Sequence, residues 1–151
     1  MRRFTKTEKV AIGVGVILLI SILDYFSNSS ATSAAGHSAV SQVEALQQMA
    51  QAYAQDARDP NHLTMLFDAS KFLQDVSAAG HKVSDYCRRA PGEGCEKLKV
   101  AIVAYTNFAS AYAAMEEPTL DTQLRSTQRD LVEMSFQNAI KATKDVQAVV
   151  Q

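Results

Sequence analysis

The hydrophobic and polar positions divide the chain into an apolar N-terminal run and a longer part with helical periodicity. Residues 10–23 form a fourteen-residue run whose only polar member is Ser21. From residue 39 onward, apolar side chains recur at alternating spacings of three and four, which places them on one face of an α-helix. No stretch alternates apolar and polar residues as a half-buried strand does. The pattern therefore predicts an all-α protein.

Proline and glycine divide residues 39–151 into four predicted helices. The apolar stripe of the first comprises Val43, Leu46, Ala50, Tyr53 and Ala57. The stripe of the second comprises Leu66, Ala69, Leu73, Val76, Gly80, Val83 and Cys87, widened by Phe67 and Phe72. Because short connections make neighbouring helices reverse direction, we expect an antiparallel bundle of about four helices. Their predicted bounds are residue 38 or 41 to 58, 59 to 89, 95 to 115, and 119 to 150.

Local signals support these bounds. Ser41 and Glu44 have the spacing of a capping box, which predicts the start of the first helix. Asp59 followed by Pro60 is typical of an N-cap and a first helical position, and Thr119 is the candidate N-cap of the fourth helix. Gly80 in the middle of the second helix indicates either a kink or a close helix crossing.

The N-terminal run is predicted to be a membrane anchor. Residues 1–9 contain four basic side chains and one acidic side chain, and a basic flank before an apolar run leaves the N-terminus in the cytoplasm. Counted through Phe26, the run reaches 17 residues, the lower end of a spanning helix. We therefore expect a cytoplasmic segment at 1–9, an uncleaved single-pass anchor at 10–26, a flexible tether at 27–38 and an extracytoplasmic helical bundle at 39–151.

A removed secretory signal is the alternative reading of the same run. Seven to fifteen apolar residues are the usual length of a signal core, and small-residue cleavage sites follow within residues 29–35. Either reading places residues 39–151 outside the cytoplasm, in the periplasm of a bacterium. Whether the segment is cleaved stays open at this point.

The two cysteines are predicted to form a disulfide. Cys87 and Cys95 are the only cysteines in the chain and lie on either side of the Pro91-Gly92 break. An even cysteine count in an exported domain favours a disulfide, and the spacing is neither a redox C-x-x-C nor a zinc pair. If the chain reverses at the break, both thiols come within bridging distance.

Composition and charge exclude several functional classes. With 15 basic and 16 acidic residues, the chain lacks the basic excess of a nucleic-acid-binding protein. The three histidines, His37, His62 and His81, are scattered, and the His81–Asp85 pair at i, i+4 is typical of a solvated helix face. No phosphate loop, nucleophile elbow or zinc-protease motif occurs. We therefore expect no enzyme activity, no metal and no cofactor.

The predicted third helix has an unusual composition. Residues 100–115 contain no charged side chain, and apolar residues cover every side of the helix. A helix that is apolar all round is buried all round, so either three neighbours cover it or part of it contacts a protein partner or a second copy. A second membrane span is the weaker alternative, because 16 residues fall short of the roughly 20 required. The partner-binding candidates are Tyr105, Phe108, Tyr112 and Met115.

A basic cluster surrounds the predicted turn between the second and third helices. Arg88 and Arg89 are the candidates for contact with anionic headgroups, since the topology places this turn on the same side of the bundle as the start of the first helix. A solvated, polar turn is the alternative explanation.

Architecture alone gives the functional expectation. We expect the protein to be a non-catalytic, membrane-anchored periplasmic subunit with an interaction or structural role. The assembly would be a bacterial envelope assembly of the secretion or conjugation type. The alternative is an exported helical inhibitor or immunity protein that neutralises a periplasmic enzyme. The identity of the partner does not follow from the sequence.

Overall fold

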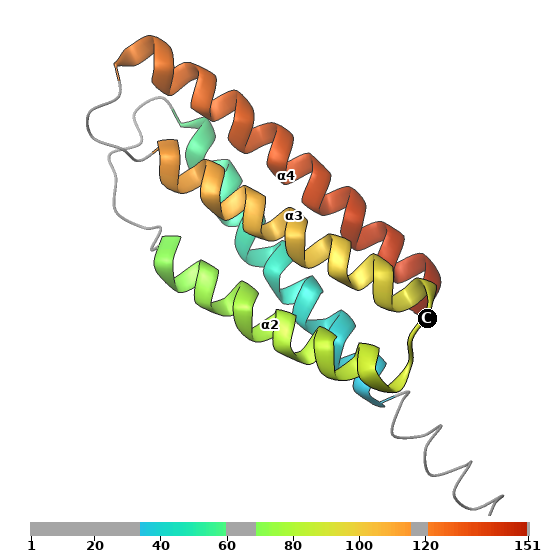
Figure 1. Cartoon of the computed structure of the whole chain (residues 1–151). Coiled ribbons are helices and arrows are strands. Elements are labelled where there is room, and N and C mark those ends of the chain that lie inside the picture. The colour runs from blue at the N-terminus through green and yellow to red at the C-terminus, as the bar shows by residue number, and fades with distance from the viewer. Residues whose placement is uncertain (1–33, 60–68, 116–120, 151) are drawn as a thin grey trace, which may run out of the picture. The chain divides into compact units, whose positions relative to one another are not determined.

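The computed structural model describes residues 34–59, 69–115 and 121–150, and all of its regular structure is helical. A first helix covers residues 34–58, followed by α2 (Ala69–Arg89), α3 (Glu93–Met115) and α4 (Thr122–Val150) (Figure 1). Over these ranges there are four helices and no strand, so the predicted all-α fold is confirmed for this part of the chain.

The four helices lie side by side as a bundle (Figure 1). α3 packs closely against both α2 and α4, whereas the backbones of α2 and α4 do not approach each other closely. The first helix contacts both of these: the Tyr53 ring meets the edge of Phe72 in α2, and Arg58 forms a bidentate ion pair with Glu133 in α4. α3 and the 34–58 helix therefore occupy opposite corners of the bundle.

Polar contacts tie the first helix to α4 along its length. The Arg58 guanidinium lies 2.9 and 2.7 Å from the two Glu133 carboxylate oxygens, and Gln147 donates to Glu44 over 2.8 Å. A hydrogen bond from Gln137, together with the Arg58 charge, holds the pKa of Glu133 below its ordinary value. These contacts lie near the surface, so we expect them to fix the alignment of the helices more than their stability.

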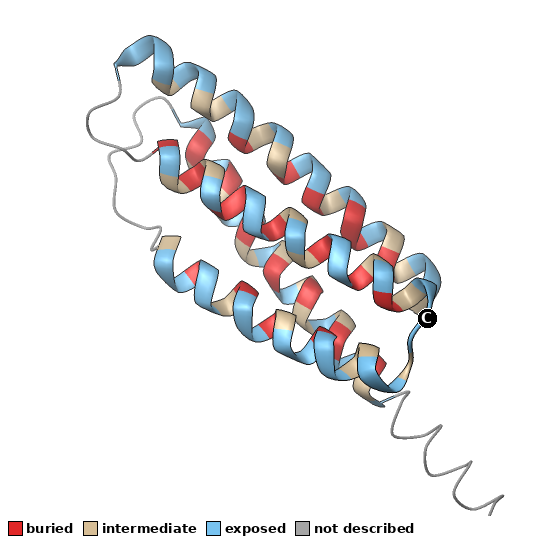
Figure 2. Ribbon diagram, viewed as in Figure 1, coloured by how far each residue is buried: buried red, intermediate tan, exposed pale blue. Residues whose placement is uncertain are grey.

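The core follows the predicted three-four spacing (Figure 2). In the first helix the predicted stripe is buried, with Tyr53 half-buried at its edge. In α2 Val76 and Val83 of the predicted stripe are buried, and so is Phe72, whereas Leu73, predicted to be in the core, is 37% exposed. Adjacent residues are about 100° apart around a helix, so only one of the two can point inward, and the larger ring does. The buried set in α2 is Phe72, Val76, Ala79 and Val83.

The first helix and α4 start at other residues than predicted. Residues 34–38, assigned to the tether, are already helical, and the Ser41 hydroxyl donates to the Ser38 carbonyl inside the helix instead of capping it. α4 begins after Asp121, whose carboxylate accepts the Leu124 N–H at 2.8 Å and therefore serves as the N-cap in place of Thr119. The anchor at 10–26, most of the tether and the predicted helix start at Pro60 lie outside the described residues.

α2 continues without a break through Gly80, beside Ile102 of α3. After Arg89 the chain turns through Pro91 and Gly92, where Gly92 has a φ of 151°, a backbone conformation that glycine adopts more readily than other residues. α3 then begins at Glu93, two residues earlier than predicted.

The start of the first helix, the α2–α3 turn and the end of α4 lie at one end of the bundle (Figure 1). We call this the turn end. A Cβ atom on Gly36 would lie 3.2 Å from the Tyr86 ring, and one on Gly94 would lie 3.0 Å from Val150. The two glycines thus allow the starts of the first helix and of α3 to lie close to Tyr86 of α2 and Val150 of α4.

Candidate functional site

One face of α3 forms the centre of the core. We call it the inner seam: Leu98, Ala101, Tyr105, Phe108, Tyr112 and Met115, all at most 5% exposed. Phe108 lies at its middle, with ring centroids 5.9 Å from both Phe72 in α2 and Phe136 in α4. Edge-on and tilted aromatic contacts of this kind add to the stabilisation that burial alone provides.

Two tyrosine hydroxyls of the inner seam find partners on other helices. The Tyr105 and Thr143 hydroxyl oxygens lie 2.7 Å apart, and Thr143 also donates to the Ala139 carbonyl. Tyr112 donates to the Asp56 carboxylate of the first helix over 2.9 Å. Burial raises the pKa of Tyr105 to about 12, although its hydrogen bond with Thr143 acts in the opposite direction.

The burial of the large side chains distinguishes between the two explanations of the uncharged helix, which were cover by neighbouring helices and contact with a partner. Tyr105, Phe108, Tyr112 and Met115 were the candidates for a partner contact, but all four are buried inside the bundle. They share one helical face because they recur at three and four, and that face is covered by the other three helices. None of them presents a surface to a partner.

The opposite face of α3 is exposed. We call it the outer seam: Val100, Val103, Asn107, Ser110 and Ala114, which also recur at spacings of three and four. Val100 is 57% and Val103 is 59% exposed, and no charged residue occurs anywhere between Val100 and Met115. The solvent face of a bundle helix ordinarily carries charged residues, so this face is unusual.

The hydroxyl groups in and beside the outer seam donate to carbonyl groups of the same helix. Thr106 donates to the Ile102 carbonyl at 2.9 Å, and Ser110 donates to the Thr106 carbonyl at 3.0 Å. With their protons bonded internally, these side chains interact less with solvent than free hydroxyls do. The face is consequently less polar than its sequence suggests.

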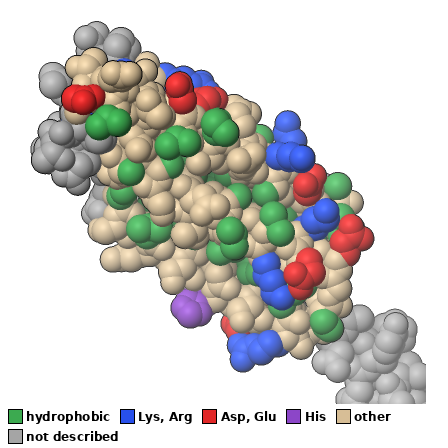
Figure 3. All heavy atoms as spheres, turned by 45° about the horizontal axis from the view of Figure 1, so that its top comes forward, with side chains coloured by type: hydrophobic (Ala, Val, Ile, Leu, Met, Phe, Trp, Pro, Cys, Tyr) green, Lys and Arg blue, Asp and Glu red, His purple; other side chains and the backbone are tan. Residues whose placement is uncertain are grey.

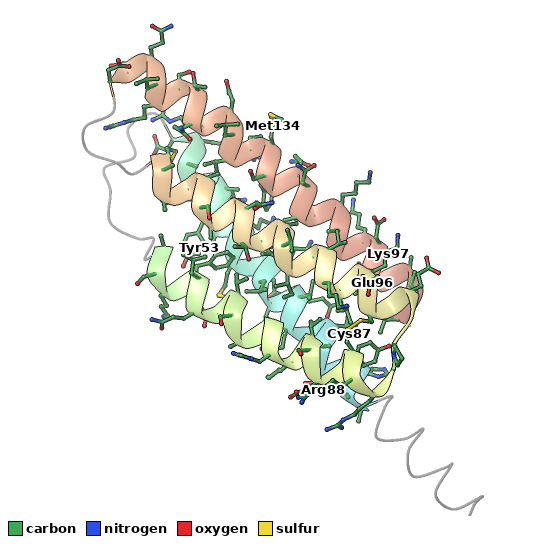
Figure 4. The ribbon with its side chains drawn as sticks, viewed as in Figure 1. Tyr53, Cys87, Arg88, Glu96, Lys97 and Met134 are labelled. Atoms are coloured by element: carbon green, nitrogen blue, oxygen red, sulfur yellow. A yellow bond between two sulfur atoms is a disulfide. The ribbon has the colours of Figure 1, made fainter. Side chains whose placement is uncertain are left out.

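The neighbouring helix extends this apolar character. Leu124, Leu131 and Met134 of α4 are 53%, 42% and 61% exposed. Met134 projects from the outer side of α4 in Figure 4, and Figure 3 shows apolar side chains scattered between charged ones on the visible face. The uncharged outer seam and these three side chains together are the best candidate for an interaction surface.

The turn end holds the two cysteines and the basic cluster. Cys87 and Cys95 are at disulfide distance, with Cα atoms 5.1 Å apart, and Cys95 is buried (Figure 4). Arg88 pairs with Asp85, and Lys99 pairs with Glu96 at 2.8 Å, both across one helical turn. Arg88 and Arg89 are exposed there, as the proposed headgroup contact requires, but local acidic partners offset much of the charge.

The two described histidines lie apart. His37 and His81 are exposed on different helices, and His62 lies outside the described residues. Within the described ranges, no group of three histidine, cysteine or acidic side chains is placed to hold a metal ion. Among the helices described, none is long and apolar enough to span a bilayer.

Comparison with known proteins adds no further assignment: the sequence matches no family model, and no curated protein and no solved structure is significantly similar to it. The surfaces described above therefore provide the basis for a functional proposal.

Proposed function

We propose that this protein is a non-catalytic, membrane-anchored periplasmic subunit that contributes a helical interaction surface to a bacterial envelope assembly of the secretion or conjugation type. The observation that carries the proposal is the exposed, uncharged outer seam of α3. Its valines are more than half exposed on a helix whose other face is fixed in the core. Exposed apolar faces on small domains usually mark protein contacts.

Two further observations support a location outside the cytoplasm. Cysteines at disulfide distance suit an oxidising compartment. In addition, the first described helix starts at the turn end, so an anchor preceding it would hold that end, with Arg88 and Arg89, toward the membrane. Basic side chains are favourable near anionic headgroups.

The position and oxidation state of the chain can be tested directly. We expect full-length protein extracted from membranes to retain residues 1–26 by intact mass. Non-reducing peptide mapping of the same sample should give one linked pair containing Cys87 and Cys95. A mature chain that starts between residues 32 and 38 would contradict anchoring and favour the exported inhibitor. Freely alkylated thiols would contradict the oxidising compartment.

The interaction surface is tested in the same gentle detergent extract. Val100→Glu introduces a charge into the outer seam, whereas Ser126→Glu adds the same charge to an exposed position of α4. We expect Val100→Glu to remove co-purifying protein and Ser126→Glu to retain it, with equal melting temperatures. Identical co-purification from wild type and both variants would refute a role for the outer seam.

A further inference from the structure

We propose that the outer seam of α3 pairs, in parallel, with the same seam of a second copy of this chain. The proposal rests on the proposed function, because it names the partner of that surface. The five residues of the outer seam have the spacing of a heptad repeat. Val100, Asn107 and Ala114 occupy a positions, and Val103 and Ser110 occupy d positions. Residues at these positions share one exposed face of the helix, the face through which two helices pair in a coiled coil.

Asn107 selects the orientation of the pair. It is exposed at the central a position, with two seam residues on either side. In a parallel pair across a two-fold axis, the Asn107 amide faces the Asn107 amide of the second copy, and each can donate to the other. In an antiparallel pair, a positions face d positions, so Asn107 would face a valine or serine. A single asparagine at an a position is a known determinant of register and of two-stranded pairing.

The charges at the start of the seam are complementary in the same orientation. Glu96 occupies the d position that precedes Val100, and Lys97 and Lys99 lie on either side of the seam. Glu96 and Lys99 already form an exposed ion pair within one chain. In a parallel pair, two glutamates would lie among four lysines, so either lysine of one copy can pair with Glu96 of the other. Beyond Lys99 no charge opposes the contact up to Met115.

The parallel arrangement also agrees with the proposed anchoring. It places the turn ends of both copies on the same side, so two chains in one membrane can pair. An antiparallel pair would place the turn ends on opposite sides, where one membrane could not hold both.

The seam is short, so the pair should be weak in solution. Residues 100–114 extend over about 21 Å of helix at 1.5 Å per residue, which is two heptads. Ser110 and Ala114 are small and allow close approach but contribute little buried area. Leu131 and Met134, exposed on the adjacent α4, can enlarge the contact. Confinement of both copies to one membrane raises their effective concentration and favours association.

Cysteine cross-linking of the full-length chain in its membrane tests the geometry. In a parallel pair, equivalent a positions face each other, so Asn107→Cys should form a disulfide-linked dimer on mild oxidation. Ser77→Cys, exposed on α2, is the matched control. We expect about tenfold more dimer from Asn107→Cys than from the control, since only facing cysteines meet the short Cα separation that a disulfide requires. Equal yields from the two variants would overturn the proposal.

Mixed cysteine variants separate the alternatives. If Asn107→Cys links only to Val103→Cys of another copy, and neither links to itself, the pair is antiparallel and the parallel proposal is wrong. If Asn107→Cys links to a different protein, the second copy is wrong as the partner, although the proposed function stands. If no cross-linked product requires a cysteine in the outer seam, both the pairing and the proposed function are wrong.

A charge variant tests the association without new cysteines. Val103→Glu places two like charges opposite each other in the pair and should weaken dimerisation of detergent-extracted chain by about tenfold or more. Ser77→Glu should leave it unchanged, and both variants should melt at the wild-type temperature. If Val103→Glu melts normally and dimerises as wild type does, the seam is not the interface.

Discussion

The inner and outer seams of α3 have the same spacing and opposite environments. Both recur at three and four over about two heptads. The inner seam contains three aromatic rings and is buried among three helices, whereas the outer seam contains two valines and three small or polar residues and is exposed. Spacing defines which residues share a face, but it does not decide which face turns inward.

Side-chain volume explains the difference. Large rings remove more apolar surface from water than valine, serine or alanine, so the fold gains more by burying the aromatic face. The outer face contains less apolar surface, too little to replace the aromatic face in the core. In the function that we propose, one face of α3 serves stability and the other serves association.

Truncation of the two seams should separate these roles most strongly. Phe108→Ala removes a fully buried ring that meets Phe72 and Phe136, and we expect it to lower the free energy of unfolding by about 3–5 kcal/mol. Val103→Ala, on the exposed side, should change it by less than about 0.5 kcal/mol. Urea unfolding followed by circular dichroism measures both. Comparable losses from the two variants would mean that the outer seam also belongs to the core.

The inner seam should also give the fold a distinct alkaline pH dependence. The pKa of Tyr105 is about 12 in the folded protein against an ordinary value of 10. Below pH 10 both states keep the proton, so stability is unaffected. Between pH 10 and 12 the unfolded chain releases the proton while the folded chain retains it, which favours unfolding.

The matched variant isolates this contribution. Between pH 9 and pH 11.5, the free energy of unfolding should fall by about 2 kcal/mol more in the wild type than in Tyr105→Phe. Denaturant unfolding at the two pH values gives the difference for each protein. Parallel losses in wild type and variant would show that Tyr105 does not titrate differently in the fold.

Periodicity predicts the helices, the bundle and the approach of Cys87 to Cys95, because these follow from local spacing and short connections. It predicts the helix starts less well. Ser41 has the sequence of an N-cap but lies within a helix, and the cap of α4 is Asp121. Capping motifs recur within helices, and only the surrounding contacts decide which one is used.

The four residues predicted for a partner contact are buried in the core, so the interaction surface that we propose lies on the other face of the same helix. Tyr105, Phe108, Tyr112 and Met115 were favoured because aromatic and methionine side chains are frequent at interfaces, yet the same residues dominate cores. The heptad from Val100 to Ala114 was already present in the sequence. Its exposure depends on how α2, α4 and the first helix surround α3, which periodicity alone does not define.

Two threonines provide the finest test, because replacement by alanine should lower the free energy of unfolding at one and raise it at the other. Thr143 lies opposite the inner seam, and its hydroxyl contacts both Tyr105 and the Ala139 carbonyl. Thr143→Ala leaves the Tyr105 hydroxyl without this partner in the core, which should cost about 1–2 kcal/mol. Thr106 lies beside the outer seam, exposed, and bonds only to its own helix at Ile102.

Thr106→Ala replaces a β-branched residue with the best helix former and should stabilise the protein by up to about 0.5 kcal/mol. Paired thermal and urea unfolding of the two variants measures the signs. If both substitutions destabilise, the Thr106 hydroxyl contributes to the fold and the outer face is not free of structural constraint. If both are neutral, the Tyr105–Thr143 hydrogen bond adds nothing to the core. Opposite signs would show that the hydrogen bond between α3 and α4 in the core contributes to stability, whereas the exposed Thr106 hydroxyl beside the outer seam does not.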